Sequence, residues 1–575
     1  MTTELLRTII ERPDEDAPRL IYADWLEERS GEVNIARAEF IRIQCDLANL
    51  PYDDDRCSDL RVREYRLLSK YHSQWKEGFQ NVGFRRGFLE VYIPEDSHSF
   101  LEESPELFAK HPIRDLKLEF DEKPGWGEII ASSPLLSRVE TLRLTYLGIG
   151  ESLALEDFLA VVSSKQLTNL ETLDASGGNL FYDRAIYEML GTRGRASPIR
   201  PGNGMLQSLK KLRKLSISEM GLSDQGVEAI VKSPLARQLT HLDLSKNIHD
   251  PYRDESMTPA GINTLIQSPL WSRLHELHIG HLELLEADQT ILALAEAISE
   301  SQIRKLGIGG ISSHESNSTS FITSLAEVAS WGKLRTLSFS FETSLNSCGL
   351  RAFLNSPNLK QVKNLSLDHC QLEAPDIEAL AASENVAGLT LLNIATAKFN
   401  ASTMEALAKA KHLNNLVVLD LSGKHLTDET LELFVQSPNA AKLQLLAIPE
   451  SIGDRGIQAI AKSPYLSRLN HLEFSWLSDD FEQPGDTGAL ALANSCTLPN
   501  LAFVDAKWGN ATERGIHALL DCERLAWFSG LEPNHDFPEL EELYESRFKE
   551  FQVDEFEWAD PEPRFLFPWA SSSLD

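Results

Sequence analysis

The sequence has few cysteines, and none of them lies in a spacing that is typical of metal binding. The six cysteines of the 575-residue chain are scattered, and no two form a Cys-x-x-Cys pair. This distribution favours free thiols in a reducing compartment over a disulfide framework or a zinc site. No apolar run approaches the length of a membrane span. The first residues, "MTTELLRTIIERPDED", become acidic too early for a signal-peptide core. We therefore expect a cytoplasmic protein that does not bind membranes.

Basic residues are also few in comparison with acidic ones. The chain has 55 Lys and Arg against 86 Asp and Glu, which gives a net charge of −31. Such a field repels phosphate backbones, so nucleic acid is a poor candidate partner. The sequence also lacks the GxxxxGK[ST], GxSxG and HExxH motifs. We predict a protein that is not an enzyme and that uses no cofactor.

The string "HELHIGH" at residues 275–281 is the most metal-like segment. Its histidines recur at every third position, but the surrounding pattern is that of a strand. Side chains alternate across a strand, so His278 shares a face with Glu276, whereas His275 and His281 have the opposite parity. A metal site needs convergent ligands, and we therefore predict no metal site here.

A repeated unit accounts for most of the chain, and "NLVVLDLSGKHLTDETLELFVQSP" at residues 415–438 shows it. Leu419 and Leu421 alternate as on a strand. Thr427 is a plausible helix N-cap. Ser437-Pro438 ends the helix, and Ser-Pro recurs at the same phase in other units. Each unit is thus predicted to contain one strand and one helix.

The first leucine of each Leu-x-Leu pair marks a strand in fourteen successive units. Between Leu365 and Leu446 the spacing is a constant 27 residues. This period, with one strand and one helix per unit, predicts a leucine-rich-repeat solenoid of the α/β class, with a parallel sheet on the concave side and helices on the convex side. The markers are Leu116, Leu142, Leu173, Leu215, Leu242, Leu277, Leu306, Leu337, Leu365, Leu392, Leu419, Leu446, Leu472 and Val504.

The repeats most resemble the ribonuclease-inhibitor type, in which Asn or Cys is favoured at the turn after the strand. Asn247 and Cys370 match that position, whereas Met220 and Lys424 do not. The resemblance therefore implies a hydrogen-bonded turn in some repeats and not in others.

The N-terminal segment "RPDEDAPRLIYADWLEERSGEVNIARAEFIRIQCDLANL" is similar to the repeat-companion domain of certain bacterial leucine-rich-repeat proteins. The "FRRGFLEVYI" junction also resembles that family's passage into its repeats. The resemblance implies an interaction role without an established activity. We expect three domains: a helical cap at 1–75, the repeats at 76–530, and a C-terminal cap helix with an acidic–aromatic tail at 531–575. Solenoid ends expose core residues, which is the physical reason for caps.

The concave face is the predicted partner site. Its outward strand positions are polar and mildly acidic, and the row beside them consists mostly of small residues. Such a trough fits a protein partner with a basic surface, although simple solvation of these positions is an equally good explanation. Two tryptophans just after their strands could anchor the partner or fill the wider turns. The predicted partner-binding residues are Asp243, His278, Asp420, Glu473, Trp476, Asp505 and Trp508.

Other surfaces remain open from the sequence. Inserted segments at 249–257, 312–320 and 478–486 lengthen strand-to-helix connections and share one rim, whereas a locally basic insertion at 191–204 follows a helix on the opposite rim. An enzyme or small-ligand site at the companion domain–repeat junction is the main alternative, with Asp24, Trp25, Arg37 and Glu39 as its residues. A purely structural or surface-assembly role is disfavoured because no export signal is found.

Overall fold

A computed structural model describes most of the chain and divides it into two compact units. The described residues are 2–120, 125–146, 153–176, 209–218, 220–245, 257–280, 288–309, 322–328, 330–340, 347–422, 425–449, 451–475, 483–506, 508 and 510–528. Unit 1 comprises Met1–Pro18 and Phe79–Arg335, and unit 2 comprises Arg19–Gly78 and Thr336–Asp575. The chain therefore passes from unit 1 to unit 2 within its first helices and returns before the repeats begin.

Unit 1 begins with a helix and a hairpin and continues as alternating strands and helices. Its strands are β1 (Val82–Arg85), β2 (Phe88–Tyr92), β3 (Asp115–Phe120), β4 (Thr141–Tyr146), β5 (Thr172–Asp174), β6 (Lys214–Ser216), β7 (His241–Leu244), β8 (Glu276–Ile279) and β9 (Lys305–Gly309). Its helices are α1 (Thr2–Glu11), α5 (Ser97–Lys110), α6 (Trp126–Ser132), α7 (Leu153–Val162), α9 (Asp224–Lys232), α10 (Pro259–Ile266) and α11 (Asp288–Ser299). Strands β2 to β9 pair in parallel, each with the next.

Unit 2 combines three N-terminal helices with the later repeats. The N-terminal helices are α2 (Asp16–Glu28, whose first turn belongs to unit 1), α3 (Glu32–Asn49) and α4 (Asp55–Trp75). The strands are β10 (Thr336–Ser340), β11 (Asn364–Ser366), β12 (Leu391–Asn393), β13 (Val418–Asp420), β14 (Leu445–Pro449), β15 (His471–Ser475), β16 (Phe503–Asp505) and β17 (Trp527–Phe528). The repeat helices are α13 (Ser347–Asn355), α14 (Ala374–Ala382), α15 (Ala401–Lys409), α16 (Asp428–Val435), α17 (Asp454–Ala461), α18 (Asp486–Ala493) and α19 (Glu513–Leu520).

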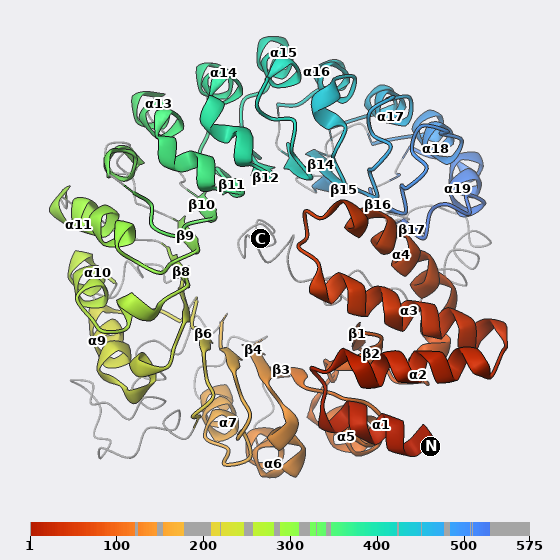
Figure 1. Ribbon diagram of the computed structural model, residues 1–575, viewed down its shortest axis with the longest axis vertical. Coiled ribbons are helices and arrows are strands. Elements are labelled where there is room, and N and C mark those ends of the chain that lie inside the picture. The colour runs from red at the N-terminus through yellow and green to blue at the C-terminus, as the bar shows by residue number, and fades with distance from the viewer. Residues whose placement is uncertain are drawn as a thin grey trace. The chain divides into compact units, whose positions relative to one another are not determined.

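The leucine markers stand in register and form the core of both units. Leu365, Leu392, Leu419 and Leu446 are direct partners along β11 to β14, and each is at most 1% exposed. In each unit the repeat helices lie on one side of the strands, as Figure 1 shows. Every marker falls inside a strand from β3 to β16. The fold is therefore a leucine-rich-repeat solenoid, as the 27-residue period predicts.

Carboxylates link the N-termini of consecutive helices in unit 2. Asp454, at the start of α17, accepts hydrogen bonds from the N–H groups of Gly485 and Gly488 at the start of α18, both at 2.8 Å. Asp486 does the same for Thr512 and Gly515 at the start of α19. The first N–H groups of a helix have no partner within it, so each aspartate satisfies donors of the next repeat.

Side-chain donors link the C-terminal ends of the same helices. The Asn439 amide donates to the carbonyl oxygens of Leu407 and Ala410 at the end of α15, both at 2.8 Å. The Ser463 hydroxyl likewise donates to the carbonyl oxygen of Val435 at the end of α16. Ser463 thus does more than precede a helix-ending proline. The thiol of Cys370 lies 3.6 Å from the carbonyl oxygen of Phe339 in the preceding repeat.

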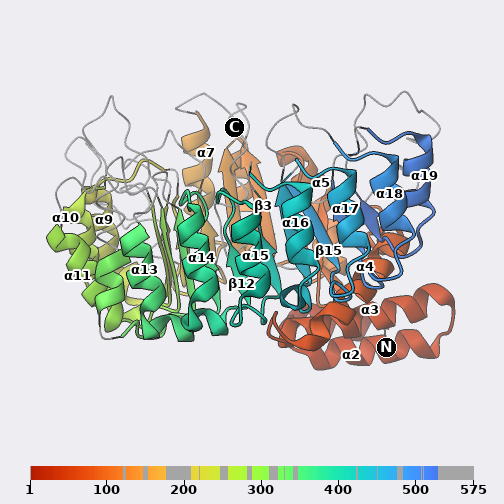
Figure 2. The ribbon, with the colours of Figure 1, turned by 90° about the horizontal axis from the view of Figure 1, so that it is seen from above.

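Helices α2 to α4 belong to unit 2 because they contact repeats that are distant in the sequence. The Ser58 hydroxyl of α4 donates to the carbonyl oxygen of Arg468 at 3.0 Å, and Val62 packs with Ala502 and Ala526. Figure 2 shows α3 and α4 at the lower edge of the row of unit 2 helices. The compact units therefore do not follow the expected domains 1–75, 76–530 and 531–575, which remain a prediction.

Candidate functional site

The three predicted carboxylates of unit 2 form one row on the sheet face, by which we mean the face of the strands away from the repeat helices. The pairing of β13 to β16 places Asp420 beside Ala447, Ala447 beside Glu473, and Glu473 beside Asp505. All three carboxylates are half-buried. Strand alternation explains the arrangement, because the Leu or Val before each carboxylate points into the core.

Asp420 is held by hydrogen bonds from Ser422, and the charges of the nearby Asp368 and Glu473 are also negative. Its Oδ1 accepts from the Ser422 backbone N–H at 2.9 Å and from the Ser422 hydroxyl at 2.5 Å. Burial raises the pKa of Asp420 to about 7, and the charges of Asp368 and Glu473 act in the same direction. A cation brought to this row would therefore restore the charged form of Asp420.

The structure describes only one of the two tryptophans that were predicted to anchor a partner. Trp508 is fully buried, so its interpretation as a surface anchor is corrected: it fills the interior, which was the alternative that the sequence left open. Trp476 lies outside the described residues. The inserted segments 191–204 and 312–320, nearly all of 249–257, and residues 478–482 also lie outside them, as does the tail 531–575.

The predicted residues of unit 1 lie on the corresponding row, but they already have partners. Asp243 accepts a hydrogen bond from the Ser216 hydroxyl at 3.2 Å and from the Ser245 N–H at 2.9 Å. His278 is 2% exposed, and its Nε2 lies 2.8 Å from Oε1 of Glu276. Its role as a partner-binding side chain is therefore corrected, because the imidazole is buried against the carboxylate beside it.

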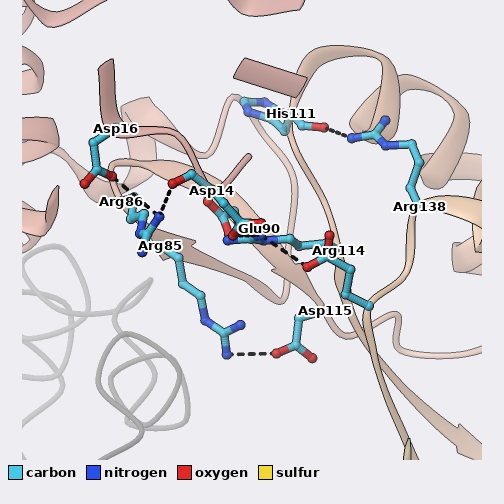
Figure 3. Close-up of polar contacts among 10 residues, drawn as sticks. Asp14, Asp16, Arg85, Arg86, Glu90, His111, Arg114, Asp115 and Arg138 are labelled. Carbon is cyan, nitrogen blue, oxygen red and sulfur yellow. Dashed lines mark hydrogen bonds and ion pairs between the residues drawn. The ribbon is translucent and has the colours of Figure 1, made fainter. Parts of the chain in front are cut away.

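Carboxylates and arginines alternate where the first repeats begin (Figure 3). Asp115, which is fully buried, lies between Arg85 at 2.8 Å and Arg143 at 2.5 Å. Unpaired buried charges are strongly destabilising. The arginines of the first strands thus neutralise a carboxylate on the sheet face of unit 1.

A second group in Figure 3 ties the start of α2 to the same strands. Arg114 pairs with the fully buried Glu90 at 2.7 Å, and it also reaches Asp14 at 2.6 Å and Glu140 at 3.2 Å. Arg86 donates to the carbonyl oxygen of Asp14 at 2.7 Å. The "RPDED" and "FRRGFLEVYI" segments are therefore parts of one ionic cluster, which the sequence does not reveal because each segment alone looks like a solvated charge run.

The four residues of the junction alternative do not converge. Asp24 pairs with Arg42 at 2.7 Å, and Glu39 pairs with Arg63 at 2.6 Å. The Trp25 ring is covered by the guanidinium of Arg29, whose central carbon is 4.1 Å from the ring centroid. Each of these three side chains is thus engaged by a neighbour within α2 to α4.

The fourth of these residues, Arg37, is packed inside the helices. Its guanidinium lies over the rings of Trp75, at 4.9 Å, and Phe40, at 5.5 Å. Burial lowers the pKa of Arg37 to about 10. Cation–π contacts of this kind contribute to packing, and they explain the aromatic residues of the N-terminal segment without a ligand.

The contact that sequence reasoning missed is the docking of α4 on the strand edge of unit 2. The rings of His471, Phe503 and Trp527 stack in succession, with centroids 4.1 Å and 4.3 Å apart, and Tyr65 of α4 lies against Phe503 at 6.2 Å. The Tyr52 hydroxyl contacts Asn364 and Thr390. One feature of the sequence could have indicated this contact. In the last repeats, the residue before the apolar strand residue has a ring side chain, as in His471, Phe503 and Trp527.

The described residues include neither a candidate metal cluster nor a helix that could span a membrane. No group of three or more His, Cys, Asp or Glu side chains there could hold a metal ion. The third histidine of "HELHIGH", His281, lies outside the described part of the chain. Among the described helices, none is both long and apolar enough to cross a membrane.

Comparison with known proteins gives little to identify the chain. Neither a scan against protein-family models nor a search of curated proteins finds a match. Among solved structures, the chain is similar to the yeast Rad7–Elc1 complex, with 14% identity, 86% of this chain and 92% of that chain covered, and a TM-score of 0.36. It is also similar to an internalin from Listeria monocytogenes, with 14% identity, 64% and 86% covered, and a TM-score of 0.28. At these TM-scores neither similarity supports an argument about function.

Proposed function

We propose that this protein is a non-catalytic scaffold for protein–protein interaction, and that a partner with a basic surface binds the sheet face of unit 2. The site would be centred on Asp420, Glu473 and Asp505. The observation that carries the proposal is the setting of Asp420: it accepts hydrogen bonds from Ser422, and the charges of Asp368 and Glu473 near it are also negative. A basic partner would bring a positive charge next to Asp420.

Several finer features belong to the same proposal. The repeats would be of the ribonuclease-inhibitor type, residues 1–75 would be a bacterial repeat-companion domain with a capping role, and the protein would act in the cytoplasm. The net charge of −31 supports a protein partner over nucleic acid. Asp243 lies on the equivalent row of unit 1 and remains a candidate for a separate contact.

The test is capture of a partner from native lysate, followed by binding kinetics at two salt concentrations. The full chain is compared with a variant that carries Asp420→Asn, Glu473→Gln and Asp505→Asn together, because single surface charges contribute only about 0–1 kcal/mol. The matched control neutralises three exposed helix carboxylates with Glu384→Gln, Glu405→Gln and Glu429→Gln.

We expect the sheet-face variant to associate more slowly and the difference to shrink at high salt, because electrostatic complementarity acts mainly on the association rate. The control should behave like the wild type. Equal association rates in all three proteins would exclude this row as the partner site.

A further inference from the structure

A strongly basic edge lies in unit 1 of this acidic protein. It consists of the five segments that lead into successive strands, at 209–214, 234–241, 269–276, 299–305 and 330–335. These segments contain ten Lys and Arg but only two acidic residues, Glu276 and Glu300. Nine of the ten basic side chains are exposed: Lys210, Lys211, Arg213, Lys214, Arg237, Arg273, Arg304, Lys333 and Arg335. We refer to these nine residues as the basic edge.

Backbone hydrogen bonds hold the segments in register, so the charges share one edge. The N–H of Thr240 donates to the carbonyl oxygen of Arg213 at 2.8 Å, and that of His275 donates to Thr240 at 2.7 Å. The ladder continues from Arg304 to His275 at 2.7 Å and from Arg335 to Arg304 at 2.8 Å. Neighbouring strands are about 4.8 Å apart, so the four steps span roughly 19 Å, which is the length of about six extended residues.

The charges of the basic edge are not neutralised within the part of the chain that the structure describes. Lys211 contacts the side-chain oxygen of Asn169, Lys333 that of Gln302, and Arg335 its neighbouring backbone carbonyl. Among the described residues, none of the nine pairs with a carboxylate. The half-buried Lys305 beside them, in contrast, is paired with Glu276 at 3.0 Å.

The pKa of His241, which lies at this edge, is affected by the basic side chains near it. Burial lowers the pKa of His241 to about 4, and the charge of Lys214 contributes in the same direction, with smaller contributions from His275 and Lys305. Glu276 opposes the shift but does not reverse it. The positive charge of Lys214 thus disfavours the protonated form of His241.

In unit 2 the corresponding edge of the strands binds a helix, α4. There the residues that lead into β16 and β17 are Ala502 and Ala526, and they are covered by Val62 of α4. Arg468, which leads into β15, is charged, and it pairs with Asp55 of α4 at 2.5 Å. The edge that binds α4 is thus either small and apolar or paired with a carboxylate, whereas the nine basic side chains of unit 1 are exposed. The Arg468–Asp55 pair shows that a carboxylate can bind a basic residue of this edge.

We infer that the basic edge of unit 1 is a docking surface for an acidic protein segment in extended conformation. Arginine is suited to such a ligand because its planar guanidinium can bind a carboxylate through two parallel hydrogen bonds. Single-stranded nucleic acid is a poorer fit, because its binding sites usually provide aromatic rings for base stacking. The two tryptophans of these segments, Trp271 and Trp331, are both buried. The surface is separate from the sheet-face row of the proposed function, and the two can fail independently.

The test measures fluorescence anisotropy of a labelled 12-residue peptide of alternating glutamate and serine, with a 12-nucleotide oligothymidine as the second probe. Wild-type protein is compared with a variant that reverses the ladder arginines (Arg213→Glu, Arg304→Glu and Arg335→Glu). The control makes the same change in net charge on exposed helix and turn lysines, with Lys232→Glu, Lys360→Glu and Lys409→Glu. A glutamine version of the ladder variant serves if charge reversal impairs folding.

We expect the wild type to bind the peptide with an affinity that falls as salt rises. The ladder variant should bind at least tenfold more weakly, and the control should stay within about threefold of the wild type. The inference is overturned if the wild type does not bind the peptide at low salt, or if both variants lose affinity equally. Tighter binding of the oligothymidine than of the peptide would also overturn it and would identify nucleic acid as the ligand class.

Discussion

Replacing Gly488 with alanine should destabilise unit 2, although alanine is the better helix former. An alanine Cβ at this position would lie 2.8 Å from Oδ1 of Asp454 and 3.2 Å from Cδ1 of Ile457. The aspartate has little freedom to move away, because the same oxygen accepts the hydrogen bonds from Gly485 and Gly488. The substitution therefore forces a choice between a steric clash and the loss of this link between repeats.

The expected magnitude follows from two opposing contributions. Alanine is favoured over glycine in a helix by about 1 kcal/mol, whereas a hydrogen bond to a charged group contributes about 1.5–3 kcal/mol. Loss of one of the two bonds thus gives a net destabilisation of about 0.5–2 kcal/mol, and loss of both gives more. An alanine Cβ at Gly456 would lie 2.7 Å from Oδ1 of Asp428, and one at Gly515 would lie 2.6 Å from Oδ1 of Asp486, so the effect should recur along the array.

A double-mutant cycle separates this mechanism from a general intolerance of alanine. Urea unfolding followed by circular dichroism is measured for Gly488→Ala, Asp454→Ala and the double variant. In the Asp454→Ala background the clash is absent, so Gly488→Ala should become stabilising by up to about 1 kcal/mol. The reasoning is refuted if Gly488→Ala has the same sign and size in both backgrounds.

Three further predictions concern other parts of the molecule. Because burial raises the pKa of Asp420 from its ordinary 3.8 to about 7, ionising this group opposes folding, and the wild type loses stability as the pH rises from about 4 through 7. Asp420→Asn should therefore raise the melting temperature more at pH 8 than at pH 5, and an equal change at both pH values would contradict the assignment. Arg114→Ala should destabilise unit 1 by about 3 kcal/mol in urea unfolding, because it leaves Glu90 buried without its partner. Arg455→Ala, on an exposed helix surface, should cost less than about 1 kcal/mol, and similar costs for the two would argue against the buried pair. Deleting residues 1–75 should lower the melting temperature and promote aggregation, because the ring stack of Phe503 and Trp527 loses its cover of α4; a truncated chain that is equally stable and soluble would exclude a capping role.

Much of the repeat architecture could be predicted from the sequence because it is encoded locally. Leu419 and Leu421 alternate on a strand, Thr427 begins a helix and Pro438 follows its end, and each of these signals acts over a few residues. Thr427 is indeed the N-cap of α16, with its hydroxyl accepting from the N–H of Thr430. Stacking identical units then follows from the need to bury two leucine rows.

The candidate site was predicted only in part, because strand parity assigns a side chain to a face but does not say what lies against it. Parity correctly placed Asp420, Glu473 and Asp505 in one row. It could not show that His278 is buried against Glu276 or that Trp508 is inside the core. Both outcomes depend on the side chains of neighbouring elements, which no short stretch of sequence contains.

The sequence by itself determined the repeating unit, its period and the side of each strand that faces the core, because these depend on residues that are close together in the chain. Only the tertiary structure decided which charges are neutralised and which elements cover the strand edges. Asp14 meets Arg114 across 100 residues, and Ser58 meets Arg468 across 410. Such contacts depend on where folding brings distant segments together. The electrostatic energy of each charged side chain is therefore determined by its partner in the fold and not by its neighbours in the sequence.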